Sequence, residues 1–510
     1  MGVHADTVSR RPWRGRVVRS GDEPAVPDSH WPALGALCLG FFMILVDSTI
    51  VSVANPAIMR ALDADIESVV WVTSAYLLAY AVPLLITGRL GDRFGQRRLY
   101  LSGLVVFTFA SLWCGMSSTI ETLIVARVLQ GFGAALMSPQ TMAVITRVFP
   151  PDRRGTAMGM WGAVGGVATL VGPLAGGVLV DGLGWEWIFF VNVPVGLVAF
   201  VLAVRFVPVL PTQAHRFDVP GVILSGVGMF FLVFGLQGAG EYPWSPGVWT
   251  SIGIGIAILV IFVWYQSLGR GEPLVPLVLF RDRNFALANI GIASIGFSIT
   301  AFMLPLMFYA QDVRGLGPTE SALLMVPMAV LSGGLAPFVG RLVDRVHPRY
   351  VAGPAFALLA VAFVWLSSAM TPDAQAWQLL LPIGLTGFAS AGIWSTLSTT
   401  ATRNLDLRLA GAGSGVYNAT RQLGAVLGSA AIAAVMAALL SARGLGDGVS
   451  QTAVGDLPEP VREAYAASMA QSMWLPAAAL TVGFVASVCF ARPQQPKIRH
   501  TSKRSSPARM

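Results

Sequence analysis

The segment GRLGDRFGQRR, residues 88–98, recurs in altered form as GRLVDRVHPR, residues 340–349. Both segments have the order Gly-Arg-Leu-x-Asp-Arg, and each follows a long stretch without charged residues. The repeat predicts that the chain contains two related halves, with this segment at the same place in each. Repeated halves of a helical protein are typical of secondary transporters, in which the substrate path runs between the halves.

The composition of the chain is that of an integral membrane protein. Of its 510 residues, 55% are hydrophobic and only 12% are charged. Soluble domains average about 25% charged residues, so too few charges are present to cover the surface of a soluble fold. The same figures exclude an intrinsically disordered chain, a coiled coil and a collagen-like assembly.

Long stretches with almost no Asp, Glu, Lys or Arg predict the membrane-spanning segments. A helix needs about 20 apolar residues to cross the hydrocarbon core, and these runs lack the alternation of membrane β-strands. They predict 14 helices, near 33–57, 68–88, 99–118, 122–146, 156–180, 187–208, 219–240, 247–268, 285–311, 320–340, 350–371, 376–401, 411–440 and 466–490.

Matching the repeated segments to these spans gives the domain organisation. The tenth span corresponds to the second, so two six-helix halves flank two extra central helices. We therefore expect an all-α integral membrane fold. Its parts are a cytoplasmic N-terminal tail, an N-terminal half, a two-helix insert with linkers, a C-terminal half and a basic cytoplasmic tail: 1–30, 31–208, 209–283, 284–490 and 491–510.

The basic residues lie mostly on one side of this topology. With the N-terminus inside, 28 of the 34 Lys and Arg residues fall in the tails and the inner loops. Such an excess marks the cytoplasmic side, so we expect a multi-pass protein of the cell membrane with both termini in the cytoplasm. The net charge of +8 then reflects orientation and attraction to an anionic inner leaflet, without any need for nucleic acid.

The cysteines and histidines show no metal-binding pattern. Three cysteines without close spacing and five histidines in tails or loop-like segments predict neither a disulfide framework nor a metal site. The sequence also lacks a GxxxxGK[ST] nucleotide-binding loop. Energy for transport would then come from an ion gradient or from the gradient of the substrate itself.

Five further motifs follow one another along the chain. They lie in the first, fourth, fifth, sixth and thirteenth spans: VDSTIVSVANP (46–56), RVLQGFGAA (127–135), GGVATLVGPLAGG (165–177), GWEWIFFVNVPVG (184–196) and RQLG (421–424). Together with the repeated segment, they resemble the major facilitator superfamily, specifically its drug:proton antiporter branch with 14 spans, over about residues 31–490. The resemblance implies the major facilitator fold, alternating access and proton-coupled efflux.

Asp47 and Arg127 are the candidate proton-coupling residues. Asp47 lies near the middle of its span, where a carboxylate costs about 2.5–3.5 kcal/mol and usually faces a cavity. Arg127 keeps its charge under any plausible perturbation, so it would tune the proton exchange of Asp47. The alternatives are a protonated carboxyl that only bonds neighbouring helices and a structural arginine that binds backbone carbonyls.

The repeated segment is a candidate gate. Asp92 follows the end of the second span, where a carboxylate can pair with basic groups or cap the N-terminus of a helix. Opening towards the cytoplasm would break that contact. The alternative is that the basic loop only fixes topology. The gating residues of the first repeat are Gly88, Asp92, Arg93, Gly95, Arg97 and Arg98, and Asp344 and Arg345 are the weaker counterpart in the second.

The fifth span carries a glycine-rich motif around a proline: Gly165, Gly172, Pro173, Gly176 and Gly177. Small residues let helices approach closely, and proline permits a bend. The antiporter motif would close the cytoplasmic side and limit proton leak, or it would serve ordinary helix packing.

Polar and aromatic residues in or near the spans could line a substrate cavity. We name as candidates Thr49, Tyr76, Tyr80, Gln130, Trp161, Asn192, Phe302, Gln311, Trp394, Asn418, Arg421 and Gln422. A single aromatic in a membrane helix more often serves packing, and Arg421 could instead stabilise the inner half of the bundle.

The sequence thus predicts a proton-coupled exporter of amphiphilic drugs or natural products. It would act as a monomer, use the proton gradient without a cofactor and catalyse no reaction. The alternatives are an exporter of a lipid, an amino acid or another endogenous metabolite, a facilitator without proton coupling, and a non-transporting membrane receptor or assembly protein.

Overall fold

The structure, a computed structural model, describes residues 30–64, 66–212, 218–241, 245–268, 273–445 and 458–492. All regular secondary structure in these ranges is helical. Thirteen helices are long and apolar enough to cross a membrane, and a bent pair of helices brings the number to as many as 14. The predicted all-α membrane fold is therefore confirmed, while the tails 1–30 and 491–510 lie almost entirely outside the described residues.

Eight helices form the first six spans: α1 (Trp31–Ala61), α2 (Ile66–Ala81), α3 (Leu84–Phe94), α4 (Gln96–Gly115), α5 (Ile120–Val148), α6 (Pro151–Leu183), α7 (Trp187–Phe190) and α8 (Asn192–Phe206). α2 and α3 together make the second span and meet at a bend of 46°. The bend occurs at Pro83, which has no N–H to continue the helical hydrogen bonds. α1 packs on α6 and α8, and α5 packs on α2 and α4.

The last six spans repeat this arrangement with eight helices: α11 (Arg283–Phe308), α12 (Pro318–Leu323), α13 (Val326–Arg345), α14 (Arg349–Ala369), α15 (Ala376–Arg403), α16 (Ala410–Ala442), α17 (Glu459–Ser472) and α18 (Trp474–Val488). α11 continues into a π-helical turn, Tyr309–Val313. α11 packs on α16 and α18, and α14 packs on α15 and α18.

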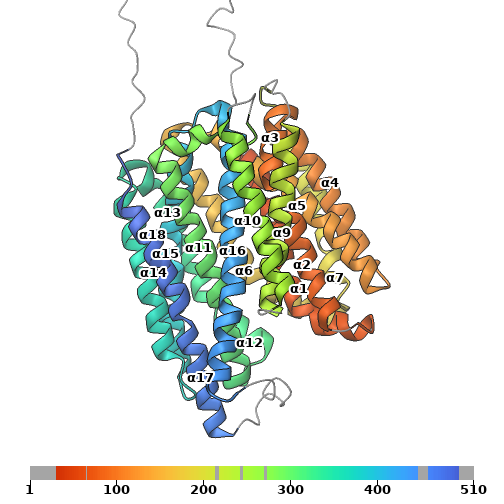
Figure 1. Cartoon of the computed structure of the whole chain (residues 1–510), viewed down its shortest axis with the longest axis vertical. Helices are drawn as coiled ribbons and strands as arrows, with labels where there is room; N and C mark the ends of the chain where they lie inside the picture. The colour runs from red at the N-terminus through yellow and green to blue at the C-terminus, as the bar shows by residue number, and fades with distance from the viewer. Residues whose placement is uncertain are drawn as a thin grey trace, which may run out of the picture.

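The two extra helices lie against both groups. α9 (Val219–Glu241) and α10 (Pro246–Ser267) pack along each other, and α9 also contacts α16 and α2. A small hydrophobic cluster joins the three helices through Ala81, Met229, Val233, Leu236 and Val426. Figure 1 shows the pair beside α16. The insert therefore covers the line along which α2 and α16 meet.

Two seams join the groups, and small residues make both of them tight. In the α6 seam, α6 packs on α13 and α15, and a Cβ on Gly159 would lie 2.6 Å from the Ala336 oxygen. In the α16 seam, α16 packs on α2, α3 and α5, and a Cβ on Gly88 would lie 2.5 Å from the Gly411 oxygen. Glycines thus let the backbones touch at both seams.

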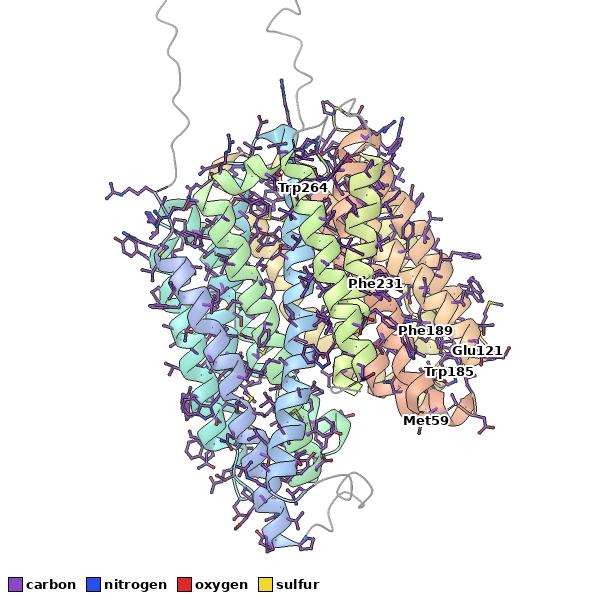
Figure 2. The ribbon with its side chains drawn as sticks, in the orientation of Figure 1. Met59, Glu121, Trp185, Phe189, Phe231 and Trp264 are labelled. Atoms are coloured by element: carbon purple, nitrogen blue, oxygen red, sulfur yellow. The ribbon has the colours of Figure 1, made fainter. Side chains whose placement is uncertain are left out.

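Aromatic residues lie both in the interior and on the outer surface of the bundle. Trp264 of α10 is 63% exposed, while Phe189 of α7 is fully buried, and Figure 2 shows both side chains. Exposed apolar side chains occur on most of the spans. Because lipid is as apolar as these side chains, such a surface suits a membrane and not water.

Candidate functional site

A closed polar network surrounds Asp47 in the middle of α1. Its Oδ2 accepts a hydrogen bond from Arg127 Nη1 at 2.5 Å, and its Oδ1 accepts bonds from Gln130 Nε2 at 2.8 Å and Asn192 Nδ2 at 2.9 Å. Asp47 and Arg127 are both fully buried. The donors come from α5 and α8. Three helices thus bring the two predicted coupling residues into one ion pair.

Besides Asp47, the Arg127 side chain contacts a backbone oxygen, an amide oxygen and an aromatic ring. Its Nε donates to the Val72 oxygen at 3.0 Å, and its Nη1 also donates to Gln130 Oε1 at 2.6 Å. The guanidinium carbon lies 4.1 Å from the centre of the Tyr76 ring, a favourable cation–π contact. Only Nη2 is buried without a hydrogen bond. Arg127 and Gln130 share a face of α5 because they are three residues apart.

Ser111 closes the network on the side of α4. Its Oγ accepts bonds from Gln130 Nε2 at 2.5 Å and from Asn192 Nδ2 at 3.4 Å. The residues of the network belong to α1, α4, α5 and α8, which are all helices of the first six spans. The network therefore lies inside the N-terminal group of helices.

Asp92 joins the first repeated segment to the beginning of α16. Its Oδ1 forms an ion pair with Arg147 Nη2 at 2.8 Å and accepts from Gln96 Nε2 at 3.1 Å. Its Oδ2 accepts from the amide of Ala412 at 3.2 Å. Ala412 lies in the first turn of α16, where backbone amides lack helical partners and favour negative charge. Asp92 thus both pairs with a base and caps a helix.

The other residues of the first segment lie around this contact. Gly95 ends α3 with φ of +96°, a conformation that favours glycine. Arg97 donates to the Val204 oxygen through Nη2. Arg93 lies over the Phe94 ring at 5.3 Å, and both Arg93 and Arg98 are exposed. Arg147 of α5, a helix outside the repeated segment, forms an ion pair with Asp92.

Asp344 of the second segment makes the corresponding contact with α6. Its Oδ1 accepts from the amide of Gly155 at 2.9 Å, and its Oδ2 accepts from the amide and hydroxyl of Thr156, both at 3.3 Å. Arg345 is exposed at the end of α13. Burial, and then the nearby charge of Arg349, lower the pKa of His347. The two repeated aspartates thus join opposite seams at one end of the bundle, here called the motif end.

Arg154 adds a third tie across the α6 seam at the motif end. Its Nη1 donates to the Thr402 oxygen of α15 at 2.9 Å, and its Nη2 donates to the Thr146 oxygen of α5 at 2.7 Å. The side chain is 6% exposed. Arg147 and Arg154 are functional candidates that the sequence did not single out, because basic residues between the spans were attributed to topology.

The glycine-rich motif of α6 packs against α1 and α12. A Cβ on Gly172 would collide with Thr49 Oγ1, and one on Gly177 would lie 3.2 Å from Thr319 Oγ1. Gly165 lies near Leu45 of α1, Gly176 is buried, and Pro173 is inside the helix. The motif thus places α6 directly on α1, two residues from Asp47.

A second polar cluster lies in the α16 seam. Arg421 Nη2 donates to the Tyr80 hydroxyl at 3.2 Å, and that hydroxyl donates to Ser138 Oγ at 3.0 Å. Ser138 Oγ in turn donates to Asn418 Oδ1 at 3.3 Å. Tyr80 and Ser138 come from α2 and α5, whereas Asn418 and Arg421 come from α16. The structure therefore brings three of the predicted cavity residues together, with Ser138 among them.

The remaining predicted cavity residues are dispersed. Trp161 stacks on Phe41 at 4.7 Å, and Trp394 packs beside Gly162 of α6. Phe302 stacks on Phe363 within the C-terminal group of helices. Gln422 is buried on α16, and Gln311 lies in the π-helical turn after α11. The structure does not bring Phe302 and Gln311 to the seam cluster.

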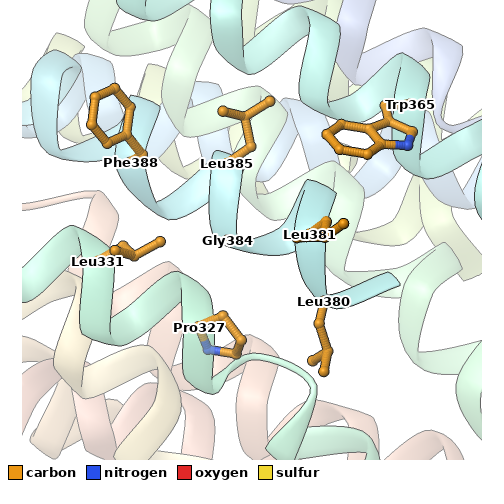
Figure 3. Close-up of a pocket in the computed structure, with 8 residues that line it drawn as sticks. All are labelled: Pro327, Leu331, Trp365, Leu380, Leu381, Gly384, Leu385 and Phe388. Atoms are coloured by element: carbon orange, nitrogen blue, oxygen red, sulfur yellow. The ribbon is translucent and has the colours of Figure 1, made fainter. Parts of the chain in front are cut away.

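An apolar groove lies on the C-terminal group of helices, away from these clusters. Its lining comes from α13, α14 and α15 (Figure 3): Pro327, Leu331, Trp365, Leu380, Leu381, Gly384, Leu385 and Phe388. The lining has almost no polar atoms to orient a solute, whereas ligand sites combine apolar walls with a few placed polar groups. The described residues contain no cluster of His, Cys, Asp and Glu that could hold a metal ion.

Comparisons with known proteins agree with this architecture. The sequence profile of the Major Facilitator Superfamily matches residues 37–429. The chain is 55% identical over 465 residues to the uncharacterized MFS-type transporter Rv1250 of Mycobacterium tuberculosis, which covers 90% of this chain and 80% of that protein. It is 36% identical over 420 residues to the tetracenomycin C resistance and export protein of Streptomyces glaucescens, covering 80% and 76% respectively.

A solved structure shows the same fold at low sequence identity. The proton:xylose symporter XylE matches with a TM-score of 0.60 at 13% identity, over 90% of this chain and 94% of that one. At this identity the likeness concerns the fold alone. The profile match spans most of the chain, and its members are transporters, not enzymes. This multi-pass membrane protein belongs to the major facilitator superfamily.

Proposed function

We propose that the chain exports amphiphilic small molecules in exchange for protons, as members of the drug:proton antiporter branch do. The observation that carries the proposal is the fully buried ion pair of Asp47 and Arg127. Asp47 is the one acidic residue deep within a span. Buried charges inside a membrane are costly and usually mark ion or proton pathways.

The contacts of Asp47 suit a carboxylate and oppose a protonated carboxyl. All three side chains that reach its oxygens act as donors: Arg127, Gln130 and Asn192. A proton on Oδ2 would face the Arg127 guanidinium and weaken the ion pair. Protonation of Asp47 would therefore separate Arg127 from Asp47. This would link proton binding to a movement of α1 against α5.

A chain of contacts leads from this pair to the α16 seam. Arg127 lies 4.1 Å from the centre of the Tyr76 ring, and the rings of Tyr76 and Tyr80 lie 6.1 Å apart, one helical turn along α2. Tyr80 then bonds to Arg421 and Ser138. A shift of Arg127 would displace Tyr76, and through it the seam contact of Tyr80. The proton site can thus influence the surface between the two groups of helices.

The two repeated aspartates would hold the motif end closed. Asp92 ties α3 and α5 to the start of α16, and Asp344 ties α13 to the start of α6. Opening the motif end would break both ties, and the two seams could then separate alternately at each end. From the excess of basic residues we propose that the motif end faces the cytoplasm.

The relatives support an amphiphilic cargo. One relative at 36% identity is named for resistance to and export of tetracenomycin C. The helices meet mainly through apolar and aromatic side chains, with only a few polar groups between them. Such a surface suits amphiphilic molecules.

Transport into proteoliposomes under an imposed pH gradient tests the proposal. Purified protein would be reconstituted, and cationic, neutral and anionic aromatic compounds offered with and without the gradient. We expect at least one compound to move faster with the gradient, and the Asp47→Asn variant to lose this acceleration. Gradient-independent movement of every compound would refute proton coupling.

A further inference from the structure

Arg421 is a charged residue that does not belong to the polar network around Asp47 and Arg127. It is the one charged residue of α16, Ala410–Ala442. Its guanidinium reaches across the seam to Tyr80 of α2. Asn418 and Tyr417 lie three and four residues earlier, on the same face of the helix. The cation is therefore placed where helices of the two groups meet.

Arg421 forms no ion pair with any of the described residues. Its one hydrogen-bonded partner is the neutral Tyr80 hydroxyl, and its buried Nε has no partner. Acidic residues on the helices packed against α16 lie near the helix ends, at Glu67, Asp92, Glu121, Glu241, Glu459 and Glu463. Arginine stays protonated even when buried, so the middle of the α16 seam carries an uncompensated positive charge.

Two further polar groups beside Arg421 are also unpartnered. The hydroxyls of Tyr417 and Ser414 are buried and form no hydrogen bond with the described residues. Both side chains are fully buried. Buried polar groups are nearly always satisfied in folded proteins. A row of unsatisfied groups next to an unpaired cation indicates a missing partner that accepts hydrogen bonds.

An apolar surface adjoins these groups. The Met142 sulfur lies 3.9 Å from Asn418 Nδ2. Met142, Phe41, Trp161 and Tyr417 belong to one hydrophobic cluster that spans the two groups of helices. A ligand at Arg421 would therefore have an acidic group on one side and an aromatic or aliphatic body on the other.

We propose that Arg421, with Tyr417 and Asn418, binds the acidic group of an anionic amphiphile in the α16 seam. This assignment rests on the proposed export function and names its substrate class. A guanidinium offers paired donors that match the two oxygens of a carboxylate. Such charge-assisted bonds are about twice as strong as neutral ones, so a carboxylate would displace Tyr80 from Arg421.

Displacing Tyr80 would also loosen the seam. The Tyr80 hydroxyl bonds to Ser138, which bonds to Asn418. An acid bound at Arg421 would compete for the Arg421 and Asn418 side chains, which connect α16 to α2 and α5. Occupation of the site and separation of the two groups of helices are thereby coupled.

Binding of three matched probes tests the charge preference without any gradient. The probes 1-naphthylacetate, 2-(1-naphthyl)ethanol and 2-(1-naphthyl)ethylammonium share one aromatic body and differ in charge. Titration calorimetry on the full chain in detergent gives each Kd. We expect the anion to bind about tenfold more tightly than the cation, as complementary charges in a buried site require.

Variants of the seam assign the preference to Arg421. In Arg421→Gln we expect the affinity for naphthylacetate to fall about tenfold and that for the alcohol to stay unchanged, while Arg421→Lys keeps part of the anion binding. Arg408→Gln removes the same charge from an exposed position before α16 and should change none of the three. Tyr80→Phe removes the competing hydroxyl, so it should bind the anion more tightly.

The outcomes separate this assignment from the proposed function. Equal binding of the three probes, no measurable binding of naphthylacetate, or an unchanged Kd in a folded Arg421→Gln protein would overturn the anion site. Folding of the variant is checked by its unfolding temperature. Gradient-driven transport of the ammonium probe alone would overturn the anion site and leave proton-coupled export standing.

Discussion

Arg127 and Arg421 both lie within membrane-spanning helices, yet their surroundings are opposite. Arg127 is fully buried inside the N-terminal group of helices, with a carboxylate, an amide, a backbone oxygen and an aromatic ring around it. Arg421 is partly exposed in the seam and bonds to a neutral hydroxyl. One charge is compensated by a carboxylate within the protein, and the other forms no ion pair with the described residues; we propose that it binds a ligand.

The sequence predicts different roles for the two residues, proton coupling for Arg127 and a place in the substrate cavity for Arg421. Breaking a buried pair leaves an uncompensated charge, whereas removing an unpaired cation leaves none. The first site should therefore govern stability and proton coupling, and the second should govern binding. Substitutions at the two sites, and at the contacts around them, test whether the roles are distinct.

The largest effect is expected at the ion pair. Asp47→Asn keeps the shape of the side chain but leaves Arg127 buried without a counter-charge, so the free energy of unfolding should fall by about 3–5 kcal/mol. Thermal unfolding in detergent, followed by tryptophan fluorescence, measures the change. Asp373→Asn is the matched control, because that carboxylate is 91% exposed, and it should leave stability unchanged.

A double variant separates stability from coupling at the same pair. In Asp47→Asn/Arg127→Gln no charge remains buried, so most of the lost stability should return. Gradient-driven transport should remain absent, because no group is left to carry the proton. A double variant that unfolds like the single one would mean that the pair is not the source of the destabilisation.

Packing beside the ion pair should give the next largest effect. Gly172→Val would force α6 away from Thr49 and Val46 of α1, and overpacking of this kind costs about 1–3 kcal/mol. Gly182→Val is the control in the same helix, since a Cβ there has no neighbour within 4 Å. Transport and unfolding temperature should both fall in the first variant only, and equal behaviour would argue against a packing role.

Loss of the Asp92 carboxylate should destabilise the first turn of α16. Asp92→Ala removes the acceptor of the Ala412 amide and the partner of Arg147, so amide hydrogen exchange at residues 410–413 should rise about tenfold. Asp344→Ala should have a smaller effect at Gly155, because Gly155 is the fifth residue of α6, whereas Ala412 is the third residue of α16, and only the first four amides of a helix lack helical partners. Exchange that is unchanged in Asp92→Ala would separate this residue from closure of the motif end.

The smallest effect on stability is expected at Arg421. Arg421→Gln leaves no buried carboxylate without its counter-charge, so the free energy of unfolding should change by less than about 0.5 kcal/mol. The same unfolding assay as for Asp47→Asn makes the comparison direct. A loss as large as that of Asp47→Asn would show that Arg421 has a structural partner and would remove the contrast between the two sites.

Sequence patterns predicted the spans well because charge is so rare in them. The runs without charged residues correspond to the helices of the structure, including the bent second span. The repeated segment predicted a carboxylate that could cap a helix, and Asp92 accepts a hydrogen bond from the Ala412 amide of α16. The segment could not indicate which helix, because Asp92 and Ala412 are 320 residues apart and only the packing of α3 on α16 brings them together.

The neighbour that a residue faces around its helix was harder to predict than the position of the residue along the helix. Phe302 and Asn192 both occur in apolar runs, yet one stacks on Phe363 and the other binds Asp47. A helix that is apolar all round carries no pattern to show which side faces a seam. Ser138 was not distinguished for the same reason, since a single serine in a membrane helix is common.

Proton movement on substrate binding tests the coupling role of Asp47 most directly. A pH-sensitive dye trapped in proteoliposomes would report protons that cross when a transported compound is added outside. We predict a pH change with the wild-type protein and none with Asp47→Asn/Arg127→Gln, although the compound still binds to both. An equal pH change with the two proteins would contradict the assignment of proton coupling to Asp47.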